Sequence, residues 1–208
     1  MRKIAILGGS FNPITKGHID IAKYVLNNSD IEEIWLSPCS SHLQKIITTH
    51  DKDRFQMCSI AIDGTTNIYV SIYEMEKKLD GSTYTLITAM KKLWKDAIDF
   101  HYIIGMDNVY NFHTWVKSEE LKSLVKFIVV PRVGFEDSKD LWYQTSPHQF
   151  LNVGSGVMES SSTQVRELLK EYWNCKWEEN VVIAENKLLE LLDRKVYRYI
   201  QTQMLYKE

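Results

Sequence analysis

Several features that would mark a specialised class of protein are missing from this chain of 208 residues. It has only three cysteines, and no two of them form a CxxC pair or a metal-ligand spacing. We therefore expect free thiols and a cytoplasmic, reducing environment. The apolar run after Arg2 and Lys3 is too short for the core of a signal peptide. No run approaches the ~20 apolar residues that a membrane span needs, so we expect no membrane association.

An excess of charge of one sign is also missing. The chain has 25 Lys and Arg residues against 27 Asp and Glu residues, a formal net charge of −2. This balance argues against a broad nucleic-acid surface, so a site for an anionic ligand has to gather its positive charge locally. We find no internal repeat or low-complexity tract, and the length fits one domain over residues 1–208 with a substantial core.

Strand and helix patterns alternate along the chain. Apolar runs predict strands at residues 4–7, 34–36, 68–72, 101–104, 127–130 and 150–153. Periodicity and capping residues predict helices at 17–27, 51–62, 82–94, from 118, at 163–172, and twice between 178 and 206. This alternation indicates an α/β protein with a Rossmann-like, doubly wound parallel sheet and a C-terminal helical segment. Loops 8–18, 38–45, 105–107, 131–132 and 154–166 should then converge at the carboxyl edge of the sheet, where such folds bind ligands.

The first of these loops contains a phosphate-binding pattern. Gly8 and Gly9 end a buried strand just before a helix, an arrangement in which backbone N–H groups and the helix dipole can receive a phosphate. The spacing is neither the dinucleotide GxGxxG nor the Walker lysine loop, which disfavours a standard dehydrogenase or P-loop ATPase. Thr15 and His18 lie three residues apart on one face of the first helical turn, and Gly17 between them leaves room for a bulky ligand.

A second pattern of this kind occupies residues 160–166, Ser-Ser-Ser-Thr-Gln-Val-Arg. Its hydroxyl groups stand at the start of a predicted helix, with Arg166 one turn later, which suits an anionic phosphate group. The alternative is purely structural: the hydroxyls would cap the helix, and Arg166 would form a surface ion pair.

The two patterns resemble the (H/T)xGH and ISSTxxR signatures of the nucleotidylyltransferase superfamily, with Thr15 at the first position and Ser160 in place of the apolar leading residue. Intermediate segments resemble the nicotinate and nicotinamide mononucleotide adenylyltransferases. They are Tyr84–Thr88 (YTxxT), Gly105–Asn108 (GxD), Trp115, Val130–Gly134 (RxG) and Val196–Ile200. The resemblance covers almost the whole chain.

This resemblance implies an enzyme that joins ATP to a pyridine mononucleotide and releases pyrophosphate. It assigns His18, Arg166 and Thr15 to catalysis. It assigns to ATP binding Gly8, Gly9, Ser10, Phe11, Gly17, Gly105, Asp107, Arg132, Ser161, Ser162 and Thr163. It assigns to mononucleotide binding Ser10, Phe11, Lys45, Tyr84, Thr85, Thr88 and Trp115. Mg²⁺ would be held mainly by the ATP phosphates rather than by protein ligands.

The residues that bear on the acceptor resemble two groups of enzymes. Residues 11–15, Phe-Asn-Pro-Ile-Thr, resemble the eukaryotic pattern, whereas Tyr84–Thr88 and the C-terminal helix resemble bacterial enzymes. We predict nicotinate mononucleotide, with nicotinamide mononucleotide as a second acceptor. Pantetheine-phosphate adenylyltransferase and a non-catalytic nucleotide-binding or chaperone-like module are the alternatives; Trp115 disfavours the first, and His18 together with Arg166 disfavours the second. Assembly into a homo-oligomer stays open.

Overall fold

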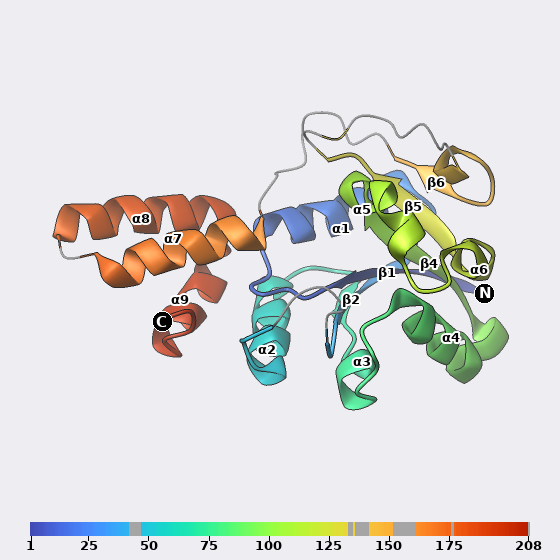
Figure 1. The fold of residues 1–208 in the computed structure, drawn as a ribbon, viewed down its shortest axis with the longest axis horizontal. Coiled ribbons are helices and arrows are strands. Elements are labelled where there is room, and N and C mark those ends of the chain that lie inside the picture. Colours follow the sequence, from blue (N-terminus) through green and yellow to red (C-terminus); the bar gives the residue numbers. More distant parts are fainter. Residues whose placement is uncertain (42–46, 133–134, 136–141, 152–160, 176, 208) are drawn as a thin grey trace.

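The computed structural model describes residues 1–41, 47–132, 135, 142–151, 161–175 and 177–207 (Figure 1). Within these residues, six strands form one parallel sheet in the order β3-β2-β1-β4-β5-β6. The strands are β1 (Arg2–Gly9), β2 (Glu33–Pro38), β3 (Ile68–Val70), β4 (Ile98–Gly105), β5 (Lys126–Val130) and β6 (Gln149–Phe150). From β1 the chain adds β2 and β3 on one side of the sheet, and it then adds β4, β5 and β6 on the other side. The boundary between β1 and β4 is therefore the switch point at which open α/β sheets bind ligands.

The strand register brings the ends of the strands to one edge. Leu7 of β1 lies opposite Leu36 of β2 and Ile103 of β4. Beyond these residues, the Cys39 N–H donates to the Gly9 carbonyl over 2.9 Å, which joins the loops that follow β1 and β2. The central strands are near-continuous apolar runs because helices cover both faces of the sheet.

The helices in the described ranges are α1 (Lys16–Asn28), α2 (Asp51–Ala61), α3 (Tyr73–Glu76), α4 (Thr83–Trp94), α5 (Met106–Tyr110), α6 (Ser118–Leu124), α7 (Ser162–Asn174), α8 (Glu178–Leu191) and α9 (Arg194–Thr202). One apolar core joins the sheet to α1, α2 and the three C-terminal helices. The other joins its opposite face to α4, α5 and α6. Figure 1 shows α7, α8 and α9 lying beyond one end of the sheet, beside α1 and α2.

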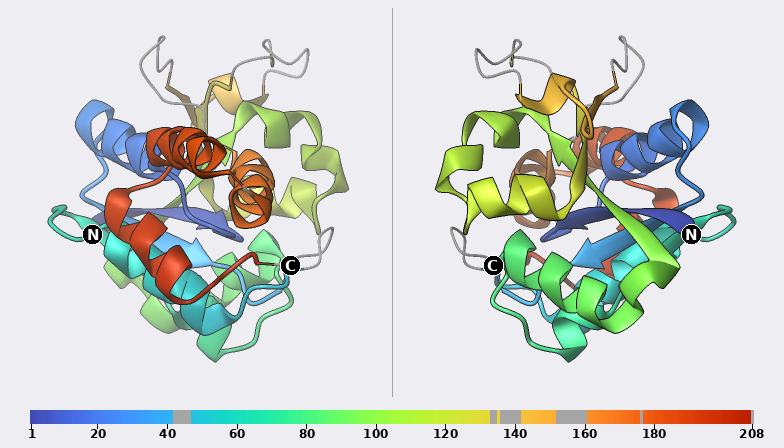
Figure 2. Two further views of the ribbon diagram at one scale, coloured as in Figure 1. Left: turned by 90° about the vertical axis from the view of Figure 1, so that its left-hand side faces the viewer. Right: turned by 90° about the vertical axis from the view of Figure 1, so that its right-hand side faces the viewer.

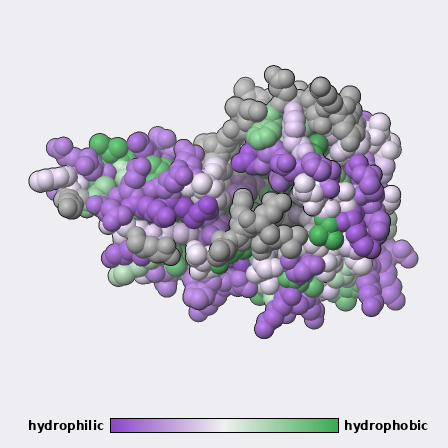
Figure 3. Space-filling view, viewed as in Figure 1, coloured by the Kyte–Doolittle hydropathy of each residue, from purple (hydrophilic) through white to green (hydrophobic). Residues whose placement is uncertain are grey.

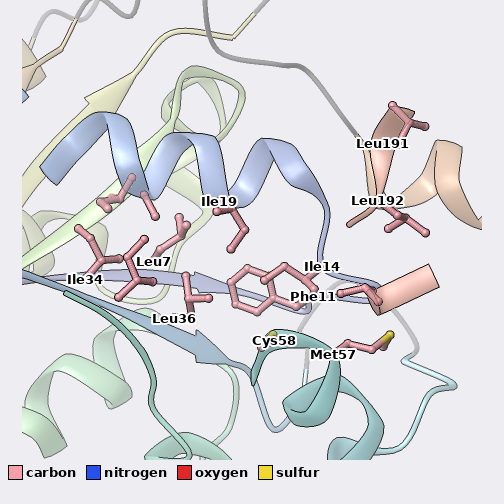
Figure 4. Packing of buried hydrophobic residues seen from close by; sticks show 14 of the residues in the cluster. Leu7, Phe11, Ile14, Ile19, Ile34, Leu36, Met57, Cys58, Leu191 and Leu192 are labelled. Carbon is pink, nitrogen blue, oxygen red and sulfur yellow. The ribbon is translucent and has the colours of Figure 1, made fainter. Parts of the chain in front are cut away.

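The first core reaches directly under the loop after β1. Phe11 and Ile14 are buried between the start of α1 and the α2 residues Met57 and Cys58 (Figure 4). Burial of one such side chain stabilises the fold by about 1.5–3 kcal/mol. The two apolar anchors therefore fix the path of this loop, although the loop itself is irregular.

Two side-chain contacts attach α9 to α2 and to the turn that follows it. The Tyr199 hydroxyl donates to Asp53 over 2.8 Å, and Lys195 pairs with Asp63 at 2.5 Å. The C-terminal helices are thus fixed against the element that follows β2.

The sequence-based fold prediction is confirmed. A strand lies at or beside each of the six predicted positions, and the main helices begin and end close to their predicted limits. The strand predicted at 150–153 is Gln149–Phe150, and residues 152 and 153 lie outside the described residues. Short α3 and α5 were not predicted, and the strand predicted at 68–72 ends at Val70. All three cysteines are free thiols, as expected. No helix within the described ranges is long and apolar enough to cross a membrane.

Candidate active site

The loop after β1 has little space for side chains at its start. A Cβ atom at Gly8 would lie 2.1 Å from the Tyr102 hydroxyl oxygen, so a larger residue would displace Tyr102. Phe11 has a left-handed backbone (φ 44°), which turns the chain while its ring enters the core. The glycine predicted to contact ATP is therefore also required by the packing of the sheet.

Thr15 and His18 contact each other at the start of α1. Thr15 is the N-cap residue and is 2% exposed. Its backbone N–H donates to His18 Nδ1 over 3.1 Å, and its hydroxyl lies 2.7 Å from the same nitrogen. A backbone N–H can only donate, so Nδ1 has to accept, and the proton of the neutral ring is on Nε2. Because the Thr15 side chain is buried against His18, we assign it the positioning of that ring.

The surroundings of His18 keep the ring uncharged. Burial lowers the pKa of His18 to about 4, and the positive charge of Arg132 acts in the same direction. The edge of the imidazole also packs against Phe11, with 5.1 Å between ring centroids. At neutral pH, His18 can therefore serve as a fixed Nε2–H donor rather than as a cation.

The second phosphate-type pattern is hydrogen-bonded to the first. Arg166 Nη1 donates to the Asn12 carbonyl over 2.7 Å, and the Ser162 hydroxyl donates to the Pro13 carbonyl over 2.8 Å. Arg166 Nη2 also donates to the Thr163 hydroxyl over 3.0 Å. The start of α7 is thus attached directly to the loop that leads to His18.

The purely structural interpretation of residues 160–166, in which the hydroxyls cap the helix, is correct for Ser161. Ser161 is the N-cap of α7, and its hydroxyl accepts the Thr163 and Gln164 N–H groups at 3.2 and 3.3 Å. Arg166 forms no ion pair within the described part of the chain; its partners are a carbonyl and a hydroxyl. No carboxylate of the described residues therefore balances the positive charge of the guanidinium at this edge of the sheet.

The loops after β4 and β5 meet through an ion pair. Arg132 Nη1 lies 2.7 Å from Asp107 Oδ2. Gly105 allows this approach, since a Cβ atom there would lie 2.5 Å from Asp107 Oδ1. The positive charge of Arg132 also acts on His18 and lowers the pKa of its ring. The edge that the sequence analysis predicted therefore brings together loops from β1, β4, β5 and α7.

Trp115 packs against Tyr102, the residue that lies next to Gly8. Its ring meets Tyr102 edge-on, with 6.3 Å between centroids and an interplanar angle of 90°. Tyr102 is the residue beneath Gly8, and its hydroxyl accepts a hydrogen bond from Thr83 at 3.3 Å. Trp115 is half-buried, so part of its indole surface stays accessible.

The start of α4 contributes the other predicted mononucleotide contacts. The Thr85 N–H donates to the N-cap Ser82, and the Thr85 hydroxyl donates to Asp80 over 3.0 Å. The Tyr84 hydroxyl donates to Glu120 over 2.9 Å, with the Lys117 ammonium 4.7 Å from the tyrosine ring centroid. Tyr84 and Thr85 are therefore already held by protein partners.

Two of the residues predicted to bind the mononucleotide, Thr88 and Lys45, are not part of these contacts. Thr88 is exposed on α4 and makes no side-chain hydrogen bond with the residues that the structure describes. Lys45 lies outside the described residues.

Arg54 was missed by the sequence analysis. It is 0% exposed in α2, where Nη1 donates to the Ser10 carbonyl over 2.8 Å and Nη2 donates to the Cys39 carbonyl over 2.6 Å. Asp51, which lies 2.6 Å from Nη2, balances its charge. Arg54 therefore holds the loops after β1 and β2 together. The only sequence signal was an arginine in the acidic first turn of a helix.

The chain is similar in sequence to known proteins. Residues 6–168 match the Cytidylyltransferase-like family. A probable nicotinate-nucleotide adenylyltransferase of Bacillus cereus (strain G9842) is 32% identical over 208 residues, with 99% of both chains covered. A protein of the same name from Bacillus licheniformis is 30% identical and covers 91% of this chain and 100% of its own.

The fold is shared with solved structures. A Plasmodium falciparum nicotinic acid mononucleotide adenylyltransferase complexed with NaAD superposes with a TM-score of 0.81 at 24% identity, covering 99% of this chain and 98% of its own. From the match over residues 6–168 and the full-length similarity to the Bacillus proteins, the chain belongs to the Cytidylyltransferase-like family and to its nicotinate-nucleotide adenylyltransferase members.

Proposed function

We propose that this enzyme transfers the AMP moiety of ATP to nicotinate mononucleotide, forming deamido-NAD and pyrophosphate for NAD biosynthesis. One observation carries the proposal within the family: Arg166 and Ser162 of the distal pattern hydrogen-bond to Asn12 and Pro13 in the loop that leads to His18. Two groups of phosphate-binding character therefore form one site.

The proposed reaction breaks and forms one P–O bond each. A phosphate oxygen of the mononucleotide attacks the α-phosphorus of ATP, and the bond to the bridging α–β oxygen breaks as pyrophosphate leaves. The nucleophile is already an anion, so no serine or cysteine nucleophile is required. Catalysis then consists of positioning the two substrates and neutralising the charge that develops on the phosphates.

The residues of the site divide this work. His18 would donate its Nε2 proton to an oxygen of the α- or β-phosphate, because Thr15 already occupies Nδ1. Arg166, together with the positive end of the α7 dipole, would receive the leaving pyrophosphate. Arg132, beside Asp107, would add a second positive charge, and the backbone of Gly8, Gly9, Ser10 and Phe11 would line the phosphate path.

We propose that Mg²⁺ enters with ATP, bound by phosphate oxygens and water. Within the described residues, no group of three or more His, Cys, Asp or Glu side chains could hold a metal ion. A cation carried by ATP would supply further charge neutralisation at the phosphates.

On the acceptor side, the accessible surface of Trp115 suits stacking with a pyridine ring. The start of α4, with Tyr84 and Thr85, lies on the same side of the sheet and would contact the mononucleotide. Nicotinamide mononucleotide differs from nicotinate mononucleotide by an amide in place of the carboxylate, and we propose it as a slower second acceptor. The free thiols fit a cytoplasmic enzyme.

The test measures pyrophosphate release from MgATP with nicotinate mononucleotide, nicotinamide mononucleotide and phosphopantetheine in separate assays. We expect the highest kcat/KM with nicotinate mononucleotide. Release only with phosphopantetheine, or with no acceptor, would refute the proposal. His18→Ala should lower kcat by roughly 10²-fold, the effect of losing one preorganised donor. His113→Ala, at an exposed histidine, is the matched control and should be unchanged.

A further inference from the structure

The end of the chain turns back toward the loop after β1. Beyond α9, left-handed backbone at Met204 (φ 50°) and Tyr206 (φ 63°) reverses the direction of the chain. Figure 2 shows this tail running from α9 across the edge of the sheet where α2 begins. Backbone and side-chain contacts hold it there: the Leu205 N–H donates to the Ile200 carbonyl, and the Trp173 indole donates to the Leu205 carbonyl, both over 3.0 Å.

Tyr206 places its hydroxyl on Asn12. The hydroxyl donates to Asn12 Oδ1 over 2.7 Å, although the two residues are 194 positions apart. Burial raises the pKa of Tyr206, so its hydroxyl stays protonated and available as a donor. A hydrogen bond with Thr49 and the positive charges of Arg166 and Arg54 oppose this increase in the pKa of Tyr206.

Asn12 is held at two of its atoms. Its side-chain oxygen accepts from Tyr206, while its backbone carbonyl accepts from Arg166 over 2.7 Å. Asn12 is only 6% exposed, so these contacts are shielded from water. The next carbonyl in the chain, that of Pro13, receives Ser162. Asn12 is therefore the point where the tail, α7 and the loop to His18 meet.

We propose that Tyr206 is a positioning residue for adenylyl transfer, whose hydroxyl holds Asn12 so that Arg166 and the loop to His18 keep the geometry that ATP requires. The inference rests on the proposed function. It makes the C-terminal tail a part of the phosphate site, because the tail reaches Arg166 through one shared residue.

The tail has other anchors, which allow this role to be tested by removing a single atom. Trp173 holds the Leu205 carbonyl, and the Lys207 ammonium lies 5.4 Å from the Trp173 ring centroid. Tyr206→Phe keeps the aromatic ring and these contacts, and it removes only the hydroxyl, which hydrogen-bonds to Asn12 and also to Thr49. Tyr199→Phe is the matched control, since it removes the hydroxyl that attaches α9 to Asp53 of α2.

We expect Tyr206→Phe to lower kcat/KM for MgATP about five- to tenfold, the effect of one lost hydrogen bond. The KM for nicotinate mononucleotide should stay within about twofold, because that substrate contacts the other side of the site. Tyr199→Phe should leave kcat/KM for MgATP and the KM for nicotinate mononucleotide within about twofold of the wild type. This should hold even if Tyr199→Phe lowers the thermal midpoint as much as Tyr206→Phe does.

A double-mutant cycle separates positioning from general stabilisation. If Tyr206 acts through Asn12, Tyr206→Phe should cause no further loss in an Asn12→Ala background. Losses that multiply, or a single variant with wild-type kcat/KM for MgATP, would overturn the inference. If the wild-type protein released no pyrophosphate with any acceptor, the proposed function would be refuted, but the role of Tyr206 in ATP binding would not. Calorimetric MgATP affinity then decides: weaker binding by Tyr206→Phe supports the role of Tyr206, and equal binding overturns it.

Discussion

At the scale of single residues, the protonation state of His18 determines what this group can do. Its pKa of about 4 and its Nδ1 contacts with Thr15 define a neutral ring with the proton on Nε2. We expect the imidazole of His18 to keep this tautomer from pH 8 down to pH 5 in nitrogen-detected NMR. Arg132→Gln should raise its pKa, because a positive charge is removed. Titration of His18 near 6.5 in the wild type would contradict this description.

Glu74 is a second buried group, and it affects stability rather than chemistry. It is 3% exposed, and Oε1 has no hydrogen-bond partner within the described residues. Burial raises the pKa of Glu74 to about 7. As pH rises from 4.5 to 7, the unfolded state loses this proton first, so the folded state binds more protons and its stability falls. Above pH 7 the loss is complete, and below 4.5 it is absent.

Glu74→Gln should therefore raise the free energy of unfolding at pH 8 and leave it nearly unchanged at pH 4.5. The gain is about 3.5 kcal/mol at most, because the pKa of Glu74 rises from 4.5 to about 7 and each unit of pKa corresponds to about 1.4 kcal/mol. Urea unfolding at the two pH values measures it, and Glu76→Gln, at an exposed position on the same helix, serves as the control. An equal gain at both pH values would show that ionisation of Glu74 is not the cause.

At the scale of elements, two neighbouring serines at the start of α7 have different functions. Ser161 caps the helix, so Ser161→Ala should cost about 1 kcal/mol of stability with little change in kcat/KM for MgATP. Ser162 instead attaches α7 to the Pro13 carbonyl, so Ser162→Ala should lower kcat/KM for MgATP severalfold. Steady-state kinetics and thermal unfolding of the two variants together measure this difference. A larger kinetic loss from Ser161→Ala would reverse the assignment.

Elements of this kind were predictable where local sequence determines them. The Ser82 cap correctly marked the start of α4, and the paired apolar runs marked the central strands. Helices α3 and α5 have four and five residues, which is too short for a periodic pattern to appear. Arg54 and Tyr206 were also missed, because their partners are the Ser10 carbonyl and the Asn12 side chain, contacts that depend on the folded chain and leave no local motif.

At the scale of the whole molecule, the site joins the first strand to the last helices. The sheet supplies the loop to His18, while α7 and the tail contribute Arg166 and Tyr206 to the same loop. ATP bound between them should stabilise both ends of the chain together, since a ligand stabilises the parts of the folded state that it contacts. Helix α6, which belongs to the second core, makes no hydrogen bond or ion pair with residues 10–18 or with α7 within the described residues.

Hydrogen exchange tests this coupling between the two ends. On addition of MgATP, we expect slower exchange both at residues 10–15 and at residues 161–166, with α6 unchanged as the internal control. Arg166→Ala should weaken the protection at 161–166 and at 10–15, because the guanidinium is one of the two side-chain contacts between the segments, beside that of Ser162 with Pro13. Protection confined to residues 10–15 in the wild type would mean that the C-terminal helices only pack against the sheet and do not hold the substrate.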